Sequence, residues 1–400
     1  MIERLMDIDR SITGDGVRRS LEMLKEKVDF NIHEIPSGTK VFDWEVPQEW
    51  VIRDAVLSDE TGKVWADYEK DFLHVVSYSE AVDKDLTHDE LKLHLYTSNF
   101  AHGIPYRTSY YKKDWGFCVD GNAYKAMNPE LKYHARIDSE FKDGSMTYGE
   151  KIIEGDEDEY IISTYCCHPS MINDNVAGMA MWADLLASMS KTKHTYRFII
   201  APETIGMISY LATHDVSKVK GAVILSHVAG PSSEPPNFKQ SFLGNSYIDR
   251  VARQATGEDG TPFTIRGSDE RQLSSPAFRI PTIILNKGGL YGPYYHTSLD
   301  REYYPPDYQA TFESAKRMIE VLEGDSVVES LNPSCEPMMS KRNLYPTLGG
   351  DNQNNTDTEN LMTVMFNSGS SLLDIAENTG KSMDELIKTS EVLKKEGLIK

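Results

Sequence analysis

The chain has 400 residues, of which 40% are apolar and 26% charged, and its formal net charge at pH 7 is -20. This composition is typical of a globular protein with two or three domains, and the negative charge disfavours nucleic acid or an anionic membrane as a partner. No stretch approaches the roughly 20 apolar residues that a membrane helix needs. The four cysteines form no CxxC pair and the N-terminus has no secretory leader pattern, so we expect a cytoplasmic protein.

The first thirty residues predict helix, because Val17, Leu21 and Leu24 share one face of the stretch "GVRRSLEMLKEKV". Pro, Gly and aromatic residues then interrupt the helical pattern, and short strand candidates follow as far as about residue 125. These strands predict a small β-rich domain inserted at 38–125, in which the segment "HGIPYRTSYYKKDWG" is expected to cover a cleft. From about residue 132, "YHARIDSEF" and "MTYGEKIIEG" predict a β-hairpin.

Strands and helices alternate beyond that hairpin. The predicted strands are "EYIISTYCC", "YRFIIA", "GAVILS" and "TIILN", and the predicted helices between them are "NVAGMAMWADLLAS", "GMISYLATH" and "NSYIDRVARQAT". This alternation predicts an α/β domain with a mainly parallel central sheet and helices on both faces. We assign it to residues 1–37 and 126–340.

The C-terminal part begins with a segment, 333–358, that is rich in Pro, Gly and Asn and predicts a linker or extended arm. The last forty residues predict three helices, with Ser382 and Gly397 capping the last one, and hence a winged helix-turn-helix. Residues 341–400 are therefore assigned to a linker and a winged-helix domain. Residues 361–400 carry six acidic and five basic residues, whereas DNA readers show a basic face, so we expect this domain to contact protein, as in a homo-oligomer.

Residue types that bind metals follow each predicted parallel strand. His168 and Asp174 come after the first strand, Glu203 after the second, His227 after the third and His296 after the fourth. Because the carboxyl ends of parallel strands meet at one edge of a sheet, we expect these side chains to lie close together. Imidazole and carboxylate groups suit zinc, and a separate glutamate can serve as general base towards a water that zinc activates. Any one histidine alone is more often structural, but together they predict one metal site.

The same motifs bring a family resemblance into view. The stretches "HPSMINDNVAG", "PETIG" and "YHTSLD" resemble the co-catalytic zinc aminopeptidases of the M28 type. The stretches "SITGDGVR", "IPSGTKVFDWEVPQEW", "IPYRTSYYKKDWGFC" and "GSDER" are similar to bacterial proteins with an aminopeptidase-like domain, an inserted β domain and a C-terminal winged helix. The resemblance implies that His168, Asp174, His227 and His296 bind zinc, with Asp174 bridging, and that Glu203 is the general base.

The resemblance also implies roles around the metal. Asp300 could orient a ligand histidine. The region "GSDER" faces substrate in the resembling family, so Asp269 and Glu270 could hold a substrate ammonium and Arg271 a carboxylate, although a surface ion-pair loop is an equal alternative. Tyr295 could form a wall of the pocket or serve in ordinary packing.

Three positions depart from the family pattern. Ser170 stands where the peptidases usually have Asp, Thr204 replaces the second residue of a Glu-Glu pair, and His227 stands where an Asp ligand is usual. One ligand of a second metal is therefore missing. We expect one tight zinc site and one weak one, so that one or two ions bind.

These observations predict a zinc-dependent hydrolase of aminopeptidase type that acts on a small peptide or an acylated amine. A single-zinc acyl transferase or cyclase, similar to the glutaminyl cyclases, is the alternative in another reaction class. A non-catalytic, metal-binding regulatory protein is the third reading.

Overall fold

The computed structural model describes residues 1–344 and 358–400. This part of the chain forms two compact units, which are Met1–Asp249 with Glu258–Ser314 and Arg250–Gly257 with Ala315–Lys400. The division at Ser314 falls within helix α10, ahead of the boundary expected at 340/341. The predicted linker continues into 345–357, which lies outside the described residues. The boundaries taken from the sequence stay predictions.

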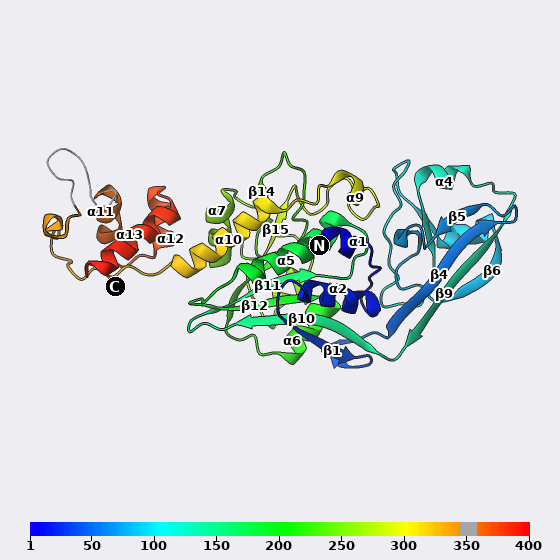
Figure 1. Cartoon of the computed structure of the whole chain (residues 1–400), viewed down its shortest axis with the longest axis horizontal. Coiled ribbons are helices and arrows are strands. Elements are labelled where there is room, and N and C mark those ends of the chain that lie inside the picture. The colour runs from blue at the N-terminus through cyan, green and yellow to red at the C-terminus, as the bar shows by residue number, and fades with distance from the viewer. Residues whose placement is uncertain (345–357) are drawn as a thin grey trace. The chain divides into compact units, whose positions relative to one another are not determined.

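The first unit is built around a mixed sheet of seven strands, most of which Figure 1 labels. Four neighbouring strands pair in parallel, and antiparallel strands flank them on both sides. The strands in spatial order are β1 (Asn31–Pro36), β10 (Ser145–Ile153), β12 (Thr195–Ala201), β11 (Glu159–Tyr165), β13 (Val219–Leu225), β15 (Thr282–Lys287) and β14 (Pro236–Lys239).

Helices follow or precede most of these strands. In the described residues they are α1 (Ile2–Met6), α2 (Asp15–Lys25), α3 (His88–Leu91), α4 (Gly121–Ala126), α5 (Ala177–Ser188), α6 (Ile205–Thr213), α7 (Tyr247–Thr256), α8 (Glu270–Leu273), α9 (Asp300–Tyr303), α10 (Gln309–Gly324), α11 (Thr358–Phe366), α12 (Leu372–Thr379) and α13 (Met383–Lys395). None of these helices has the length and apolar character that crossing a membrane requires.

Both faces of the central sheet are covered by helices. Phe198 and Ile199 are neighbours on β12, so their side chains point to opposite faces. Phe198 packs against Trp182 of α5, with ring centroids 6.0 Å apart, whereas Ile199 lies in one buried cluster with Ile208 of α6. The α/β architecture expected from the sequence is therefore confirmed.

The insertion forms its own sheet, although the hairpin predicted next to it is wrong. Its four strands in spatial order are β5 (Val64–Asp67), β4 (Glu49–Asp59), β9 (Lys132–Lys142) and β6 (Val82–Thr87). β9 pairs with β4 and β6 in this sheet, but β10, which follows it directly, pairs with β1 and β12 in the central sheet. The turn at Gly144 therefore connects two sheets, because each strand finds its partners far away in the sequence. Two smaller pairs are β2 (Lys40–Val41) with β3 (Trp44–Glu45) and β7 (Leu95–Thr97) with β8 (Phe117–Val119).

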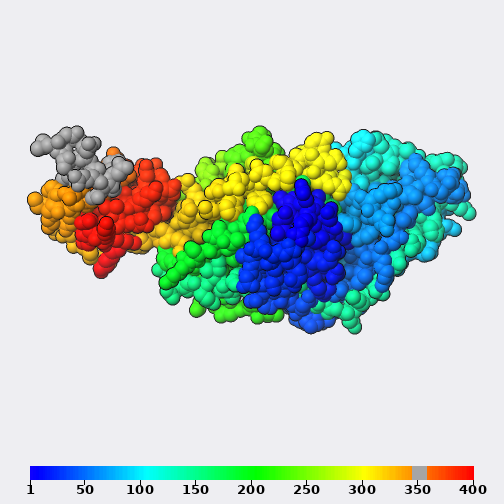
Figure 2. Space-filling model, viewed as in Figure 1, coloured from blue at the N-terminus to red at the C-terminus, as the bar shows by residue number. Residues whose placement is uncertain are grey.

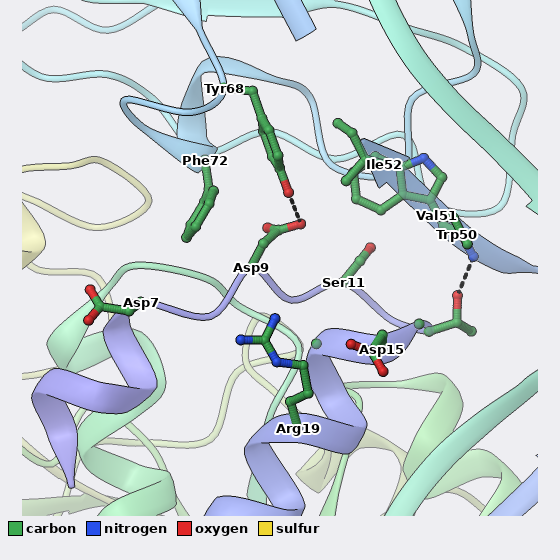
Figure 3. A pocket seen from close by; sticks show the side chains of 13 residues that line it. Asp7, Asp9, Ser11, Asp15, Arg19, Trp50, Val51, Ile52, Tyr68 and Phe72 are labelled. Carbon is green, nitrogen blue, oxygen red and sulfur yellow. Dashed lines mark hydrogen bonds between the residues drawn. The ribbon is translucent and has the colours of Figure 1, made fainter. Parts of the chain in front are cut away.

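Polar contacts fix the N-terminal segment to the inserted sheet. The Tyr68 hydroxyl donates to Oδ2 of Asp9 (2.7 Å), and the backbone N–H of Trp50 donates to the Thr13 hydroxyl (3.1 Å). Figure 3 shows both bonds at the border of a hollow of about 220 Å³. In Figure 2 this dark-blue segment lies at the surface beside the light-blue inserted sheet. The N-terminal segment is thus fixed to the inserted sheet, while α2, which follows it, contacts β10 of the central sheet.

The second unit contains the helix-turn-helix. A capping box starts α12, because the hydroxyl of Ser371 accepts the N–H of Asp374 while the Asp374 carboxylate accepts the N–H of Ser371. Isolated β-bridges join Val327 to Ser371 and Ser330 to Ile399. Three helices with such short strand pairings are the arrangement of a winged helix, as the sequence predicts.

A buried ion pair on the edge strand β14 generates a stability prediction. Nζ of Lys239 lies 2.6 Å from Oε1 of Glu270, and the two side chains are 3% and 0% exposed. Lys239→Ala leaves a buried carboxylate without its cation, so we expect the free energy of unfolding to fall by about 3–5 kcal/mol in urea titrations.

Arg53 supplies the matched control, since it forms ion pairs with Asp138 and Glu140 but is 49% exposed. Arg53→Ala is expected to cost less than about 1 kcal/mol. Equal losses for the two variants would contradict the assignment of a buried pair.

Candidate metal centre

The ends of four parallel strands deliver one cluster of side chains. His168 follows β11, Glu203 follows β12, His227 follows β13, and His296 lies in the loop after β15. Asp174 comes from the short helical turn η3 (Ile172–Val176), which connects β11 to α5. One ligand atom each from His168, Asp174 and His296 lies within 4.8 Å of the others. These side chains thus lie at the carboxyl edge of the parallel strands, which is where their positions in the sequence predict them.

Asp174 stands at the centre of the cluster. Its Oδ1 accepts a hydrogen bond from the Tyr165 hydroxyl (2.6 Å). Its Oδ2 lies 3.1 Å from Nε2 of His296 and 4.0 Å from Nε2 of His227. Neither Oδ2 of Asp174 nor Nε2 of His227 has a hydrogen bond of good geometry within the described chain, although both are buried. A buried carboxylate oxygen and an imidazole nitrogen thus face each other without a bond between them.

The protonation states suit a cation. Burial lowers the pKa of His168 to about 4 and also lowers the pKa of His227, so both imidazoles are neutral at pH 7 and keep a lone pair. Burial alone would raise the pKa of Asp174, but His168, His227 and His296 together hold it well below its usual range. Neutral imidazoles around an ionised carboxylate form a donor set that fits zinc.

Neighbouring side chains fix the ring nitrogens of two histidines. Nδ1 of His227 lies 2.8 Å from the Ser226 hydroxyl, which leaves Nε2 directed towards Asp174. Nδ1 of His168 lies 3.4 Å from Sγ of Cys167. Partners of this kind orient imidazoles for metal binding.

The backbone is strained around the cluster. Four non-glycine residues adopt positive φ angles there, namely Ser170, Thr204, His227 and His296. Such conformations cost about 1–3 kcal/mol each and persist where the surroundings impose them. The carbonyl of His296 accepts the N–H of Tyr106 (2.7 Å), and Oδ1 of Asp269 accepts the N–H of Thr204 (2.7 Å).

Two supporting residues hold the backbone next to the ligands. The buried Arg10 donates from Nη2 to the carbonyl oxygen of His168 (3.0 Å). Asp300 accepts the N–H of Asn173 (2.8 Å), so its carboxylate holds the turn that carries Asp174. Burial, aided by the charge of Asp174, raises the pKa of Asp300 to about 7. The proposed action of Asp300 on a ligand histidine stays a prediction.

Glu203 lines the same small cavity as the metal-binding side chains. The cavity measures about 20 Å³ and is bordered by His168, Asp174, Glu203, His227 and others. A space of this size holds an ion or a water, because one water needs about 10–15 Å³. Burial raises the pKa of Glu203 to about 7, and burial together with Glu203 raises the pKa of Asp269 well above its usual range. A carboxyl group with such a pKa exchanges protons near neutral pH.

Of the other residues expected at the site, Tyr295 borders this cavity, whereas Asp269, Glu270 and Arg271 follow Ser268, which borders it. Tyr295 stacks on His296 with ring centroids 3.8 Å apart. The carboxylate of Glu270 is bound by Lys239 and by the N–H of Ser268 (2.7 Å). Nε of Arg271 donates to the carbonyl of Ser268 (3.0 Å). Contacts of Asp269, Glu270 and Arg271 with a substrate stay predictions.

The inserted domain closes the cluster from above the strand ends. Residues 104–106 pair with 296–298 through an isolated bridge between Pro105 and Thr297. The ring of Tyr106 lies 5.0 Å from that of His168 and 5.1 Å from that of His296. Residues 104–106 of the segment "HGIPYRTSYYKKDWG" therefore lie against the cluster, and a covering role for the whole segment stays a prediction.

Sequence reasoning missed Tyr165, Arg10 and Ser226 as supports of the cluster. Tyr165 ends β11 in a run of buried residues, where an aromatic side chain is ordinary core. Arg10 lies 158 positions from the carbonyl that it binds, and no local pattern marks it.

Comparison with known proteins places the chain in a family. The family model described as "Domain of unknown function (DUF4910)" matches residues 1–325, and one described as "winged helix-turn-helix" matches residues 326–400. A protein of Clostridium acetobutylicum named "Putative polysaccharide biosynthesis protein with aminopeptidase-like domain" is 37% identical over all of this chain and 95% of its own length.

Solved structures show where the fold recurs. The crystal structure of a "putative peptidase" from Clostridium acetobutylicum is 37% identical, covers 100% of this chain and 94% of its own, and superposes with a TM-score of 0.91. A zinc aminopeptidase from Bacillus subtilis is 13% identical with a TM-score of 0.55, covering 80% of this chain and 92% of its own. At that identity the likeness shows a shared fold.

The expectation about nucleic acid is unchanged by these matches. A winged helix-turn-helix could bind DNA, yet α13 carries Asp384, Glu385 and Glu391 among its lysines. That this unit does not bind nucleic acid stays a prediction.

Zinc binding is tested by thermal unfolding. A ligand present at 100 times its dissociation constant stabilises a protein by about 2.7 kcal/mol. Adding zinc to the metal-free wild type is therefore expected to raise the melting temperature by several degrees. Asp174→Asn is expected to abolish most of the rise, because asparagine keeps an oxygen for Tyr165 but removes the charge that the cation needs.

His102→Ala is the matched control, since this exposed histidine lies outside the cluster. It should show the wild-type response. A wild type that does not respond to zinc, or an Asp174→Asn variant that responds fully, would refute the metal centre.

Proposed function

The chain belongs to the family of the domain of unknown function DUF4910, and we propose that its strand-end cluster is the active centre of a zinc-dependent amide hydrolase of aminopeptidase type. The observation that carries the proposal is the open Oδ2 of Asp174, which faces imidazole nitrogens in a cavity that Glu203 also lines. Metal-binding groups and a carboxyl of raised pKa in one closed space suit hydrolysis.

Each side chain has a defined part in this proposal. His168, Asp174 and His296 would hold zinc, with His227, which faces the same carboxylate oxygen of Asp174, as a further ligand. Zinc, when bound, would lower the pKa of a water molecule and polarise the carbonyl group of an amide. Glu203 takes the proton of that water and passes it to the leaving amine. Tyr106 and Tyr295 exclude bulk water from the cluster.

A single tight zinc is favoured over two. Thr204 stands where a second metal would find a glutamate in the resembling peptidases, and its N–H is bound by Asp269. Thr204 offers only a hydroxyl, which is a poorer zinc ligand than a carboxylate. A second ion would therefore bind weakly.

The replacement of a metal-binding glutamate by Thr204, which favours a single zinc, also supports the alternative reaction. A centre with one zinc and a neighbouring pair of carboxyl groups, Glu203 and Asp269, also suits intramolecular acyl transfer, as in a glutaminyl cyclase. Incubation with peptides that begin with glutamine separates the two candidates, because cyclisation releases ammonia whereas hydrolysis of the next peptide bond releases free glutamine.

We propose a small peptide or an acylated amine as the substrate. The peptidase description of one relative supports the former, and the polysaccharide name of the other supports an acylated amino sugar. A cytoplasmic location is also proposed, in keeping with the unpaired thiols of Cys118, Cys166 and Cys167.

The catalytic role of Glu203 is tested by Glu203→Gln. The amide cannot accept the proton of the attacking water, so we expect kcat/KM to fall about 10²–10⁴-fold while the zinc content stays at the wild-type level. The measurement is hydrolysis of aminoacyl p-nitroanilides and of N-acetylglucosamine oligomers, with zinc quantified by mass spectrometry.

Glu140→Gln changes an exposed glutamate of β9 in the same way and should leave the rate unaltered. A Glu203→Gln variant that keeps both its zinc and its rate would remove Glu203 from the mechanism.

A further inference from the structure

The first unit has a large open cleft in addition to the small cavity at the cluster. It has a volume of about 680 Å³, within the range of small-molecule sites, whereas the cavity at the cluster measures about 20 Å³. The cleft is bordered by β3 with its flanking residues, by the loop around Tyr111 and by Phe141 of β9, all from the first unit. A substrate larger than the reacting group must therefore place its remainder outside the cluster, and this cleft offers the room.

Aromatic side chains connect the cleft to the cluster without a break. Tyr106 contacts His168, and its hydroxyl lies 2.8 Å from that of Tyr110. The ring of Tyr110 neighbours that of Tyr111, with centroids 6.1 Å apart. Tyr111 borders the cleft, so Tyr110 and Tyr106 lead from the cleft to His168.

The walls of the cleft are open aromatic faces. Trp44 and Tyr111 are 37% and 44% exposed, and their rings meet edge to face at 83° with centroids 5.0 Å apart. Tyr78 and Phe141 pack against each other below them, at 4.7 Å. Exposed aromatic groups gathered in a concave surface indicate a ligand site.

The rim of the cleft is polar and nearly balanced in charge. It carries three acids, two lysines and an amide, which are Asp43, Glu45, Asp143, Lys112, Lys113 and Gln48. Such a rim has no excess of positive charge for a polyanion. It does offer donors and acceptors around flat apolar faces. This combination matches a pyranose ring, which has an apolar C–H face and hydroxyl groups along its edge.

An extended peptide fits the cleft less well. Peptides commonly bind by adding a strand to an exposed sheet edge. Two strands line the cleft, β3 (Trp44–Glu45) and the end of β9 at Phe141. β3 has only two residues, which is too short an edge for strand addition, and β9 already pairs with β4 at Phe141.

We propose that this cleft, here called the aromatic cleft, binds a sugar ring of the substrate, which would make the substrate an N-acylated amino sugar in an oligosaccharide. The assignment as a substrate site rests on the proposed hydrolase activity, whereas the binding of sugar does not. In the reaction the C–N bond of the amide breaks, the hydroxyl of water goes to the carbonyl carbon, and the proton goes to the nitrogen. A carboxylate and a free amino sugar are released.

Binding is measured by calorimetry on the zinc-loaded Glu203→Gln protein, so that turnover does not interfere. The probe is N,N′,N″-triacetylchitotriose. Trp44→Ala and Tyr111→Ala, each placed in the Glu203→Gln background, are expected to weaken binding about tenfold, since each removes one stacking face. Trp44→Phe retains a face and should stay within about threefold of the parent.

Phe366→Ala is the control, because Phe366 is 67% exposed and belongs to the second unit. It should bind the trisaccharide as the parent does. The response of the melting temperature to zinc shows that each cleft variant is folded around an intact metal centre.

A second titration uses the tripeptide Phe-Gly-Phe. Binding of the trisaccharide that depends on Trp44 supports the aromatic cleft as a sugar site. Absence of trisaccharide binding, or trisaccharide binding that is unaffected by Trp44→Ala, overturns it, as does Trp44-dependent binding of the tripeptide alone. A failure of the hydrolase proposal would appear instead as retained activity in Glu203→Gln, with sugar binding intact.

Discussion

The buried carboxylate of Asp174 is the group on which the rest of the site depends. An ionised carboxylate removed from water is costly unless hydrogen bonds or opposite charges compensate for it. Tyr165 satisfies one oxygen, and the other is directed at Nε2 of His296 and His227. The strained backbone at His227 and His296 keeps the imidazoles facing this oxygen. The chain thus holds a buried negative charge, which a divalent cation would balance, beside imidazole nitrogens that can bind the same ion.

The sequence predicts those features of the site that depend on local pattern, and not those that depend on contacts between distant residues. Strand ends are readable from local pattern, and parallel strands bring their carboxyl ends together, so the convergence of His168, Asp174 and His296 followed from the sequence. The residues that hold these three side chains in place could not be predicted from the sequence. Arg10 and Tyr106 act across 158 and 190 positions, and only the tertiary fold shows what they contact.

The predicted hairpin failed for the same reason. Both segments have the composition of strands, and a short turn at Gly144 joins them, which locally favours pairing. In the structure β9 runs along β4 for its whole length and β10 lies between β1 and β12. Long-range pairing with these partners outweighed the local preference, because each strand buries one face against a different core.

The comparison with zinc aminopeptidases separates what the fold supplies from what this chain adds. A shared sheet provides the edge at which ligands gather, and function depends on the side chains placed there. Here Thr204 is engaged through its backbone by Asp269, and the neighbouring Glu203 keeps a carboxyl of raised pKa. In the proposed hydrolase, Thr204 would leave one metal ligand fewer than in the resembling peptidases, whereas Glu203 would still accept the proton of the attacking water.

The pairing of residues 104–106 with 296–298 has a consequence for how this protein can change over time. The backbone of the insertion is bound to the loop that carries His296, so removal of the insertion would take away one wall of the candidate metal centre. Substitutions that move residues 104–106 would also shift the loop of His296. We therefore expect these two segments to change together in evolution.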